Sequence, residues 1–345
     1  MARTRSRAAT TVLLVLTALM ALLATSAPEA NAAQASRPTS LKPLISGVVD
    51  RDGPPPAALA KIVDAYVVQV NWSRLQPKPH SFRSRVLDRA LAKAHRSHSQ
   101  VKLRVLTGVH SPGWAKRLGG APVPMHDPHD GQSGTVPRFW TSRFGSAYAD
   151  LQARLAQRYD RNAALREVVV SRCTTFYAEP FIRQTADRAT RKALRHAGYS
   201  AARDRRCHRQ EIAAHRVWKQ TRSGLALNPA QLVTRGGGRT VDTGFTIAMM
   251  RYCRDTLAAR CVLENNSIRS PIGSLGDSYG RMYAAMADHA PGLGFQTATA
   301  VRMGSCADTL DWAADRGASY VEIPWNASDA GCTRQVLRNF SQRVG

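Results

Sequence analysis

Four carboxylates stand at or near the ends of apolar, β-branched runs in this sequence: Asp50, Glu179, Glu264 and Glu322. Such runs are typical of strands that are buried in a parallel sheet. A buried strand rarely tolerates an unpaired carboxylate, so each of these acids requires an explanation. One explanation is general acid–base catalysis by carboxyl groups gathered at one rim. The other is a structural ion pair with one of the many arginines.

Glu179 closes the stretch 165–180, LREVVVSRCTTFYAEP, around which the rest of the chain can be arranged. The valines at its start indicate a strand that is buried on both faces. Pro180 cannot continue a central strand, so we expect this strand to stop there, with Glu179 just beyond its carboxyl end. In barrels of alternating strands and helices, catalytic groups gather at that end. Glu179 is therefore the leading catalytic candidate.

Aromatic and amide side chains fall close to the same predicted strand ends. Flat rings together with amides suit the faces and hydroxyls of sugars, although each ring taken alone could equally belong to the core. The expected substrate-binding residues are Asp50, Trp72, Trp114, Tyr177, Asn228, Asn265 and Trp325, with Asn266 and Asn326 beside them.

Eight predicted strands must position these residues. They cover 44–50, 66–72, 101–107, the opening part of 165–180, 225–229, 261–266, 293–300 and 320–324. Helical spacing of apolar residues predicts helices over 57–64, 81–98, 139–159, 181–221, 243–260, 277–288, 306–316 and 333–344. Strands that alternate with helices indicate parallel βαβ units. We therefore expect the α/β class: a single (β/α)8 TIM barrel over 44–345.

Two glycine-rich segments are interpreted as loops. The segment 108–137 is rich in Gly, Pro and His, and loops of this length are often functional. Gly236 to Gly238 lack the Lys-Ser/Thr of a phosphate-binding loop, so we expect a flexible turn there. No glycine fingerprint follows the first strand, which argues against a dinucleotide-binding fold. The sequence shows no cofactor motif.

The N-terminus has the pattern of a secretory signal peptide over 1–32. Arg3, Arg5 and Arg7 precede an apolar segment, 11–24, that is short for a membrane span, and Ala30-Asn31-Ala32 fits a cleavage site. An uncleaved anchor is the alternative. We expect a disordered lead-in over 33–43 and no transmembrane segment in the mature chain, which would be secreted.

All six cysteines follow the predicted signal peptide. An even number in an exported chain suggests disulfides, and six cysteines allow 15 pairings. We expect neighbours to pair: Cys173 with Cys207, Cys253 with Cys261, and Cys306 with Cys332. Zinc is the rival interpretation, but no pair of C-x2-C motifs is present, so we expect no metal site.

The chain is strongly basic, with a formal net charge of +25. Such a surface favours polyanions, among them nucleic acid, acidic polysaccharide and an anionic cell envelope. Arginine is spread along the chain, so a general bias in composition is the alternative. No nucleic-acid-binding signature is present. We expect no specific nucleic-acid partner and a surface that could associate with an anionic envelope.

Several motifs resemble those of the (β/α)8 glycoside hydrolases of the large retaining clan, especially its β-galactosidase-like and cellulase-like members. They are WSRLQP at 72–77, P-x-W at 112–114, Tyr159-Asp160 and YAEP at 177–180. The resemblance implies that the acid/base is a glutamate at the end of strand four, a position that Glu179 matches. The clan usually places asparagine before that glutamate, and here the residue is Ala178.

Strand seven departs from the clan pattern. The clan carries its nucleophilic glutamate there, whereas the segment 293–300, LGFQTATA, offers only Gln296. Either Glu322 takes the role, the strand count is off by one, or the retaining mechanism has been lost. If Glu179 pairs with Glu322 or Glu264, one carboxylic acid would protonate the departing glycosidic oxygen. The other carboxylate would attack the anomeric carbon if the two carboxyl groups are about 5–5.5 Å apart, or activate water if they are about 6.5–9.5 Å apart.

The general acid must hold its proton near neutral pH, so its pKa should be raised. Arg74 or Arg172, if close, would lower that pKa by favouring the ionised form. The sequence therefore predicts a secreted glycoside hydrolase that needs no cofactor and acts on a poly- or oligosaccharide. Its alternatives are an inactive glycan-binding barrel and a basic envelope protein that binds acidic polymers.

Overall fold

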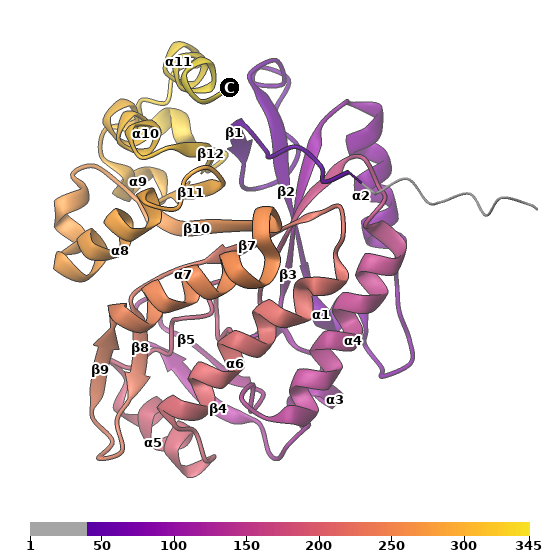
Figure 1. The fold of residues 1–345 in the computed structure, drawn as a ribbon, viewed down its shortest axis with the longest axis vertical. Helices are drawn as coiled ribbons and strands as arrows, with labels where there is room; N and C mark the ends of the chain where they lie inside the picture. Colours follow the sequence, from indigo (N-terminus) through magenta and orange to yellow (C-terminus); the bar gives the residue numbers. More distant parts are fainter. Residues whose placement is uncertain (1–39) are drawn as a thin grey trace, which may run out of the picture. The chain divides into compact units, whose positions relative to one another are not determined.

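The computed structural model describes residues 40–345, and within them eight parallel strands close into a barrel (Figure 1). The strands are β1 (Gly47–Asp50), β2 (Val63–Asn71), β3 (Gln100–Leu106), β6 (Leu165–Val169), β7 (Arg222–Ala226), β10 (Cys261–Ile268), β11 (Leu293–Thr297) and β12 (Ala318–Ile323). Every expected strand has a counterpart, so the (β/α)8 barrel is confirmed. The predicted signal peptide lies outside the described residues.

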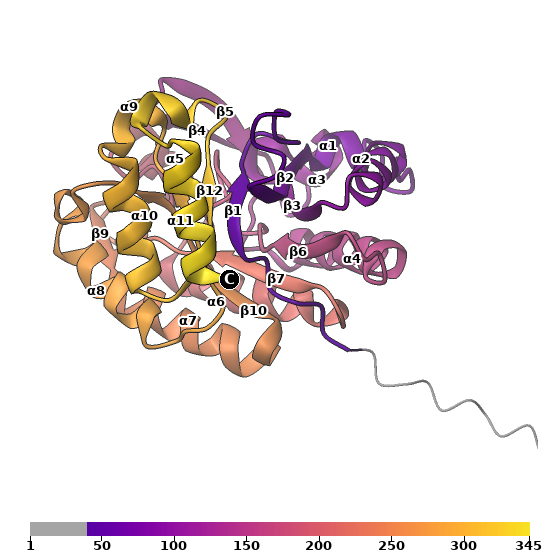
Figure 2. The same ribbon diagram turned by 90° about the horizontal axis from the view of Figure 1, so that it is seen from above.

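Helices surround the barrel, as the view from above shows (Figure 2). They are α1 (Trp72–Leu75), α2 (Arg85–Arg96), α3 (Gly113–Lys116), α4 (Ser142–Tyr159), α5 (Arg188–His196), α6 (Ala201–Ala214), α7 (Thr243–Leu257), α8 (Asp277–Ala287), α9 (Ala300–Met303), α10 (Cys306–Asp315) and α11 (Arg334–Val344). Five short 3-10 turns join them: Gly108–His110, His215–Val217, Ala258–Arg260, Ile272–Leu275 and Ala327–Ala330.

Local sequence explains where several helices begin and which face they bury. Side chains of Asp187, Ser200, Asp242, Ser305 and Thr333 accept a hydrogen bond from a backbone N–H in the first turn of α5, α6, α7, α10 and α11. Helix α4 buries the residues that its spacing predicts, among them Phe144, Tyr148, Leu151 and Leu155.

The barrel closes through β1, which pairs with β2 on one side and β12 on the other. Because side chains alternate along a strand, every second residue points into the barrel. On β3, Lys102, Arg104 and Leu106 face inward, while Val101, Leu103 and Val105 belong to the core between the barrel and its helices. Two of the inward residues on this one strand are therefore cationic.

Three local expectations are wrong. The fourth strand ends at Val169, and the residues up to Pro180 form a loop. The segment 57–64 forms turns and then β2 in place of a helix. The segment 108–137, interpreted as a loop, contains an antiparallel hairpin of β4 (Val123–Asp127) with β5 (Gln132–Val136). The predicted turn at Gly236 to Gly238 is present, and it joins the strands of a second hairpin, β8 (Ala230–Val233) with β9 (Arg239–Asp242). Both hairpins lie in connections that follow strands of the barrel.

All three expected disulfides are present: Cys173–Cys207, Cys253–Cys261 and Cys306–Cys332. The predicted disordered lead-in, 33–43, falls mostly outside the described residues. At its end, however, Lys42 is buried and its Nζ donates to Asn162 O, Leu165 O and Thr221 Oγ1 at 2.7–2.8 Å. Ordered structure therefore begins before residue 44.

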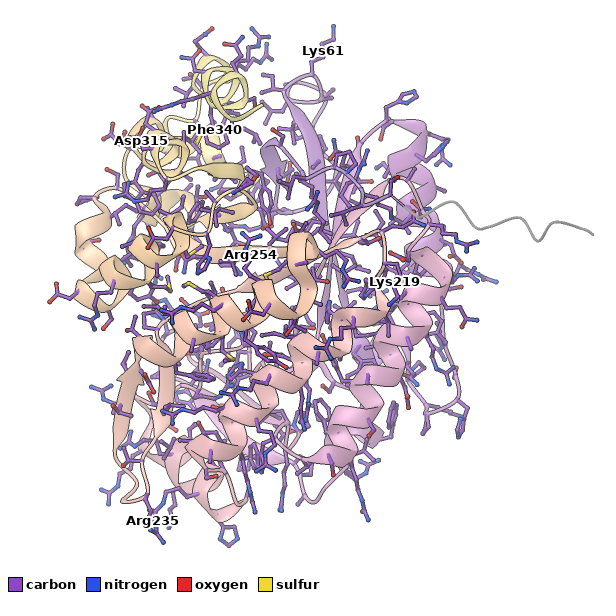
Figure 3. The ribbon with its side chains drawn as sticks, viewed as in Figure 1. Lys61, Lys219, Arg235, Arg254, Asp315 and Phe340 are labelled. Carbon is purple, nitrogen blue, oxygen red and sulfur yellow. A yellow bond between two sulfur atoms is a disulfide. The ribbon has the colours of Figure 1, made fainter. Side chains whose placement is uncertain are left out.

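Basic side chains are spread over the outer surface. Figure 3 labels Lys61, Lys219 and Arg235 at separate places on the molecule, and all three residues are exposed. Within residues 40–345, the helices lack the combination of length and apolar character that crossing a membrane would require.

Candidate active site

The carboxyl ends of the barrel strands open into adjoining cavities. The cavity of about 610 Å³ is lined by Arg51, Asp52, Gln69, Asn71, Arg104, Glu179, Asn266 and Gln296, among others. A second of about 310 Å³ shares Arg51, Tyr177, Glu179, Asn266 and Gln296 with the first. A third of about 750 Å³ shares His129, Tyr177, Ile182 and Tyr279 with the second. The shared residues join the three into one cleft across the mouth of the barrel.

Glu179 reaches this cleft on the loop after β6, not at the end of the strand itself. The disulfide of Cys173 with Cys207 ties that loop to α6. Ser171 Oγ donates to Val105 O at 2.7 Å, and Thr107 Oγ1 lies 2.7 Å from Thr174 Oγ1. The polar residues after β6 thus find partners on the neighbouring strand connection, which is why the chain leaves the ladder after Val169 without unpaired polar groups.

The carboxyl group of Glu179 is held toward its protonated form. Burial raises its pKa above the ordinary value, and the nearby charge of Glu322 adds to this. Arg104 and a hydrogen bond from Asn266 act in the opposite direction without reversing the shift. Arg104, on β3, is thus the opposing cation. Arg172 instead donates to Phe139 O and Thr141 O.

Glu322 lies inside the barrel and is 0 % exposed. Arg104 Nη2 donates to its two carboxylate oxygens at 2.9 and 3.1 Å, and Lys102 Nζ lies 2.6 Å from Oε1. These cations lower the pKa of Glu322 to about 2 despite burial. Glu322 is therefore an ionised carboxylate that is fully engaged by two cations.

Glu264 belongs to the same buried network. Lys102 Nζ donates to Glu264 Oε2 and lies 3.2 Å from Glu167 Oε1, and Tyr320 OH donates to Glu167 at 2.8 Å. Burial and the neighbouring Glu167 raise the pKa of Glu264 well above its ordinary value, against the charge of Lys102. Three carboxylates surround one ammonium group, which raises the pKa of Lys102 although burial opposes it. We call Lys102, Glu167, Glu264, Tyr320 and Glu322 the barrel network.

Two of the expected substrate-binding residues line the cleft. Tyr177 borders all three cavities, and its hydroxyl lies within hydrogen-bonding distance of Asp127 and Asp130 in the β4–β5 hairpin. Asn228 borders the second cavity and accepts a hydrogen bond from Tyr279 OH at 2.9 Å. Asp50 is buried at the end of β1, where Oδ1 accepts from Asp52 N at 2.9 Å. It therefore shapes the turn that carries Asp52.

The other expected residues lie elsewhere. Trp72 is fully buried, donates to Gln76 Oε1 at 2.9 Å and packs against Phe144 and Trp114. Trp114 donates to Gln76 O at 2.9 Å. Trp72 therefore belongs to the packing between the barrel and α4, which corrects the expectation of a sugar-binding role for this ring. Trp114 is half-buried and does not line the cavities described above, and its sugar-binding role stays a prediction.

Asn265 and Trp325 also lie outside the cavities, the first in the core and the second on the surface. Asn265 is buried, with its Nδ2 donating to Leu227 O and its Oδ1 accepting from Tyr283 OH, both at 2.8 Å. Its amide is thus used in the core, whereas the next residue, Asn266, faces the cleft. Trp325 is 74 % exposed, and its backbone N–H donates to Asp52 Oδ2 at 2.9 Å. The ring is free to contact a ligand that extends beyond the cavities.

Most cationic and amide residues of the cleft were not predicted from the sequence, chiefly Arg51, Arg104, Asn71, Arg269 and Arg302. A signal for one of them was present. Lys102 and Arg104 alternate with Val and Leu in a strand that is apolar on its other face. Period-two alternation of charges in a central barrel strand indicates a charged interior.

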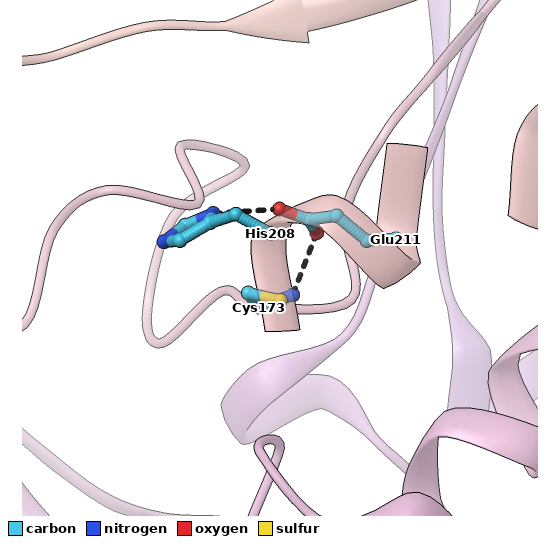
Figure 4. A group of neighbouring side chains, drawn as sticks. All are labelled: Cys173, His208 and Glu211. Carbon is cyan, nitrogen blue, oxygen red and sulfur yellow. Dashed lines mark hydrogen bonds and ion pairs between the residues drawn. The ribbon is translucent and has the colours of Figure 1, made fainter. Parts of the chain in front are cut away.

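One group of potential metal ligands occurs among residues 40–345: Cys173, His208 and Glu211 (Figure 4). The sulfur of Cys173 is bonded to Cys207, so it cannot supply the thiolate that a metal would bind. Glu211 accepts from Cys173 N at 2.8 Å, and His208 Nδ1 lies 2.9 Å from Glu211 Oε1. The group is a structural hydrogen-bond network beneath the Glu179 loop.

No protein-family model matches the sequence, and no curated protein matches it. Solved structures do match. The catalytic domain of β-amylase from Paenibacillus polymyxa aligns with 86 % of this chain and 97 % of its own, with a TM-score of 0.57 and 12 % identity. Endo-glycoceramidase II from Rhodococcus sp. aligns over 84 % of this chain and 76 % of its own, with a TM-score of 0.51 and 14 % identity.

An endo-β-1,4-glucanase from Xanthomonas axonopodis pv. citri gives a TM-score of 0.50 at 12 % identity, over 86 % of this chain and 99 % of its own. At such identities the likeness concerns the fold. The chain shares the (β/α)8 barrel fold of these three structures.

Proposed function

We propose that this protein is a glycoside hydrolase that cleaves O-glycosidic bonds of an oligo- or polysaccharide, with Glu179 as the general acid. One observation carries the proposal. A half-buried glutamate with a raised pKa faces a cleft at the carboxyl end of a barrel of the glycoside hydrolase type. A carboxyl group held in its protonated form there can donate to the glycosidic oxygen as the bond breaks.

The second carboxylate is expected to work through water. Gln296 occupies the strand-seven position and cannot form a glycosyl ester, and the barrel network engages Glu264 and Glu322. The acids that share a cavity with Glu179 are Asp52 and Asp130. In a single displacement, one of them takes a proton from water while the oxygen of that water bonds to the anomeric carbon. Glu179 gives its proton to the departing oxygen, and exchange with solvent restores both groups.

Sugar contacts beyond the scissile bond are assigned to side chains of the cleft and its rim. Tyr177 and Asn228 line the cavities next to Glu179, and exposed Trp325 offers a flat face for stacking. Asp50 supports the position of Asp52 and is assigned no direct contact. Hydrolysis by this arrangement requires no cofactor.

We further infer that the protein is secreted and that its signal peptide is cleaved near Ala32. Three disulfides within residues 40–345 support an oxidising destination. The formal net charge of +25, with basic residues on many faces, supports association with an anionic cell envelope.

A second function has a specific observation in its favour. Because Gln296 replaces the nucleophile position and two of the candidate carboxylates are bound to Lys102, a glycan-binding barrel without turnover is the alternative. A screen of aryl glycosides and polysaccharides distinguishes the two functions. Hydrolysis predicts turnover that falls in Glu179→Gln and in either Asp52→Asn or Asp130→Asn. Saturable glycan binding without turnover by the unaltered protein would establish the alternative.

A further inference from the structure

The cavity of about 310 Å³ next to Glu179 is rich in guanidinium groups. Arg51, Arg269 and Arg302 line it together with His129, while its acids are Asp130 and Glu179. The three arginines come from three connections, after β1, β10 and β11. Their convergence is therefore a property of the folded mouth and not of one basic segment.

These guanidinium groups are only lightly engaged by the protein. Arg51 Nη1 donates to Thr297 O at 3.2 Å, and its nearest acid, Asp52, lies 4.0 Å away. Arg269 Nε makes a long contact of 3.4 Å with Ser274 Oγ, and Arg302 Nη1 donates to His129 Nε2. Within residues 40–345, neither Arg269 nor Arg302 forms an ion pair with a carboxylate. Most of their donors remain available to a ligand.

Several other arginines of the described chain are paired with an acid. Arg104 is paired with Glu322 and Arg183 with Asp204, and even the surface residue Arg158 is paired with Asp88. Among residues 40–345, Arg269 and Arg302 have no carboxylate partner, and Arg51 has only the 4.0 Å pair with Asp52. Like charges gathered in one concave site repel each other, which costs stability unless a ligand compensates. Burial already lowers the pKa of Arg51, so a bound anion would relieve that cost.

We propose that this cavity is a subsite for a negatively charged sugar unit, whose carboxylate or sulfate is bound by Arg269, Arg302 and Arg51. The proposal rests on the proposed function, because it names the substrate class of the same cleft: an acidic polysaccharide. Planar guanidinium groups bind the oxygens of such anions in pairs, with charge-assisted hydrogen bonds. Since Glu179 borders the same cavity, the charged unit would lie beside the bond that is cleaved.

The test measures binding by the mature protein carrying Glu179→Gln, so that turnover does not interfere. Affinities are determined by calorimetry at 150 mM NaCl. One pair of probes is oligogalacturonate and its neutral methyl ester, which tests the carboxylate. A second pair is chondroitin sulfate and unsulfated chondroitin oligosaccharides, which tests the sulfate.

The variant of interest is Arg269→Gln with Arg302→Gln. Its matched control is Arg85→Gln with Arg89→Gln, which removes the same charge from exposed positions on α2, on the outside of the barrel. Thermal melting confirms that both variants are folded. The cavity variant is expected to lose about tenfold or more in affinity for at least one acidic probe, because charge-assisted hydrogen bonds disappear. The control variant is expected to keep its affinity.

Three results would overturn the subsite. The first is equal affinity, in both probe pairs, for the more charged and the less charged or neutral member. The second is an equal loss of affinity in the cavity variant and the control variant, and the third is no binding of any acidic probe. Turnover is scored separately with Glu179 intact. Turnover of neutral glycans without a preference for acidic ones would support the hydrolase and reject the subsite. Acidic binding that depends on Arg269 and Arg302, without any turnover, would support the subsite and reject the hydrolase.

Discussion

Arg104 donates to both carboxylate oxygens of Glu322, at 2.9 and 3.1 Å, and at the same time borders the cavity that Glu179 faces. The pair links the charged interior of the barrel to the candidate general acid. Glu322 compensates Arg104, which limits how strongly this cation can favour the ionised form of Glu179. Glu322 thus acts on the site through Arg104 and has no need to touch a substrate.

The first prediction concerns the stability of the barrel network. Glu322→Gln leaves Lys102 and Arg104 with less compensation in a buried environment. Removing one partner of a buried ion pair costs about 3–5 kcal/mol. We expect a loss of this order in the free energy of unfolding, measured by chemical denaturation. Asp311→Asn, which breaks an exposed pair with Arg343, should cost about 1 kcal/mol or less. Equal small effects in both variants would contradict the assignment.

Acid denaturation gives a second, independent prediction. The folded protein lowers the pKa of Glu322 from 4.5 to about 2, so the unfolded chain binds the extra proton between these values. The stability contributed by this group is complete above pH 4.5 and is lost as the pH falls toward 2. The Glu322→Gln protein should therefore lose less further stability across that window than the unaltered protein. Parallel stability curves for the two proteins would reject the shifted pKa.

A third prediction follows from the charge that opposes the proton on Glu179. A general acid works in its protonated form, so activity should fall as the pH rises through its raised pKa. Arg104→Gln removes the main charge that lowers this pKa, and the basic limb of kcat/KM against pH should move to higher pH. Arg74→Gln changes an exposed residue on α1 and should leave the limb in place. A shift to lower pH in Arg104→Gln would contradict the account.

The fourth prediction tests how the barrel accommodates its network. Gly224 on β7 provides the space for Glu264, because a Cβ there would lie 1.4 Å from Glu264 Oε1 and 2.7 Å from Glu167 Oε1. Gly224→Ala should destabilise the fold by about 1–3 kcal/mol or more, as overpacking does. Gly280→Ala on α8, where nothing lies within 4 Å, should be neutral or stabilising. The melting temperatures of the two variants are measured by thermal unfolding. Equal melting temperatures for Gly224→Ala and Gly280→Ala would exclude the steric explanation.

A fifth prediction separates the loop of Glu179 from the rest of the fold. Replacing Cys173 and Cys207 together by Ala removes the tie between that loop and α6, at a cost of about 2–5 kcal/mol. Turnover should fall even at temperatures where the variant remains folded by circular dichroism. The matched variant without Cys253 and Cys261, a closure of only eight residues, should retain turnover. Equal losses of turnover would show that the first disulfide has no special role in the site.

The fold was accessible from the sequence because most barrel strands have an apolar pattern rich in β-branched residues and most connections have helical spacing. The hairpins were missed because their strands lie in segments rich in Gly and Pro, and β4 itself contains Pro124. The end of the fourth strand was misplaced because Ser171 and Thr174 find partners on the neighbouring strand β3 and the connection after it, which local sequence does not reveal.

Prediction of the site was less complete, for a physical reason. Sequence position places a residue near a strand end but does not say whether its side chain turns to the cleft or to the core. Glu179 and Tyr177 border the cavities, whereas Trp72 turns into the packing against α4. The arginines of the cleft come from separate connections, and only the closed barrel brings them together.

The most direct test of the central claim compares Glu179→Gln with the unaltered protein on two substrates of the same sugar. A natural glycoside has a poor leaving group that needs protonation, whereas a dinitrophenyl glycoside leaves readily without it. We expect kcat/KM for the natural glycoside to fall by about 100-fold or more in the variant, and to fall far less for the dinitrophenyl glycoside. Equal losses on both substrates, or no hydrolysis by the unaltered protein, would contradict the assignment of Glu179 as the general acid of a glycoside hydrolase.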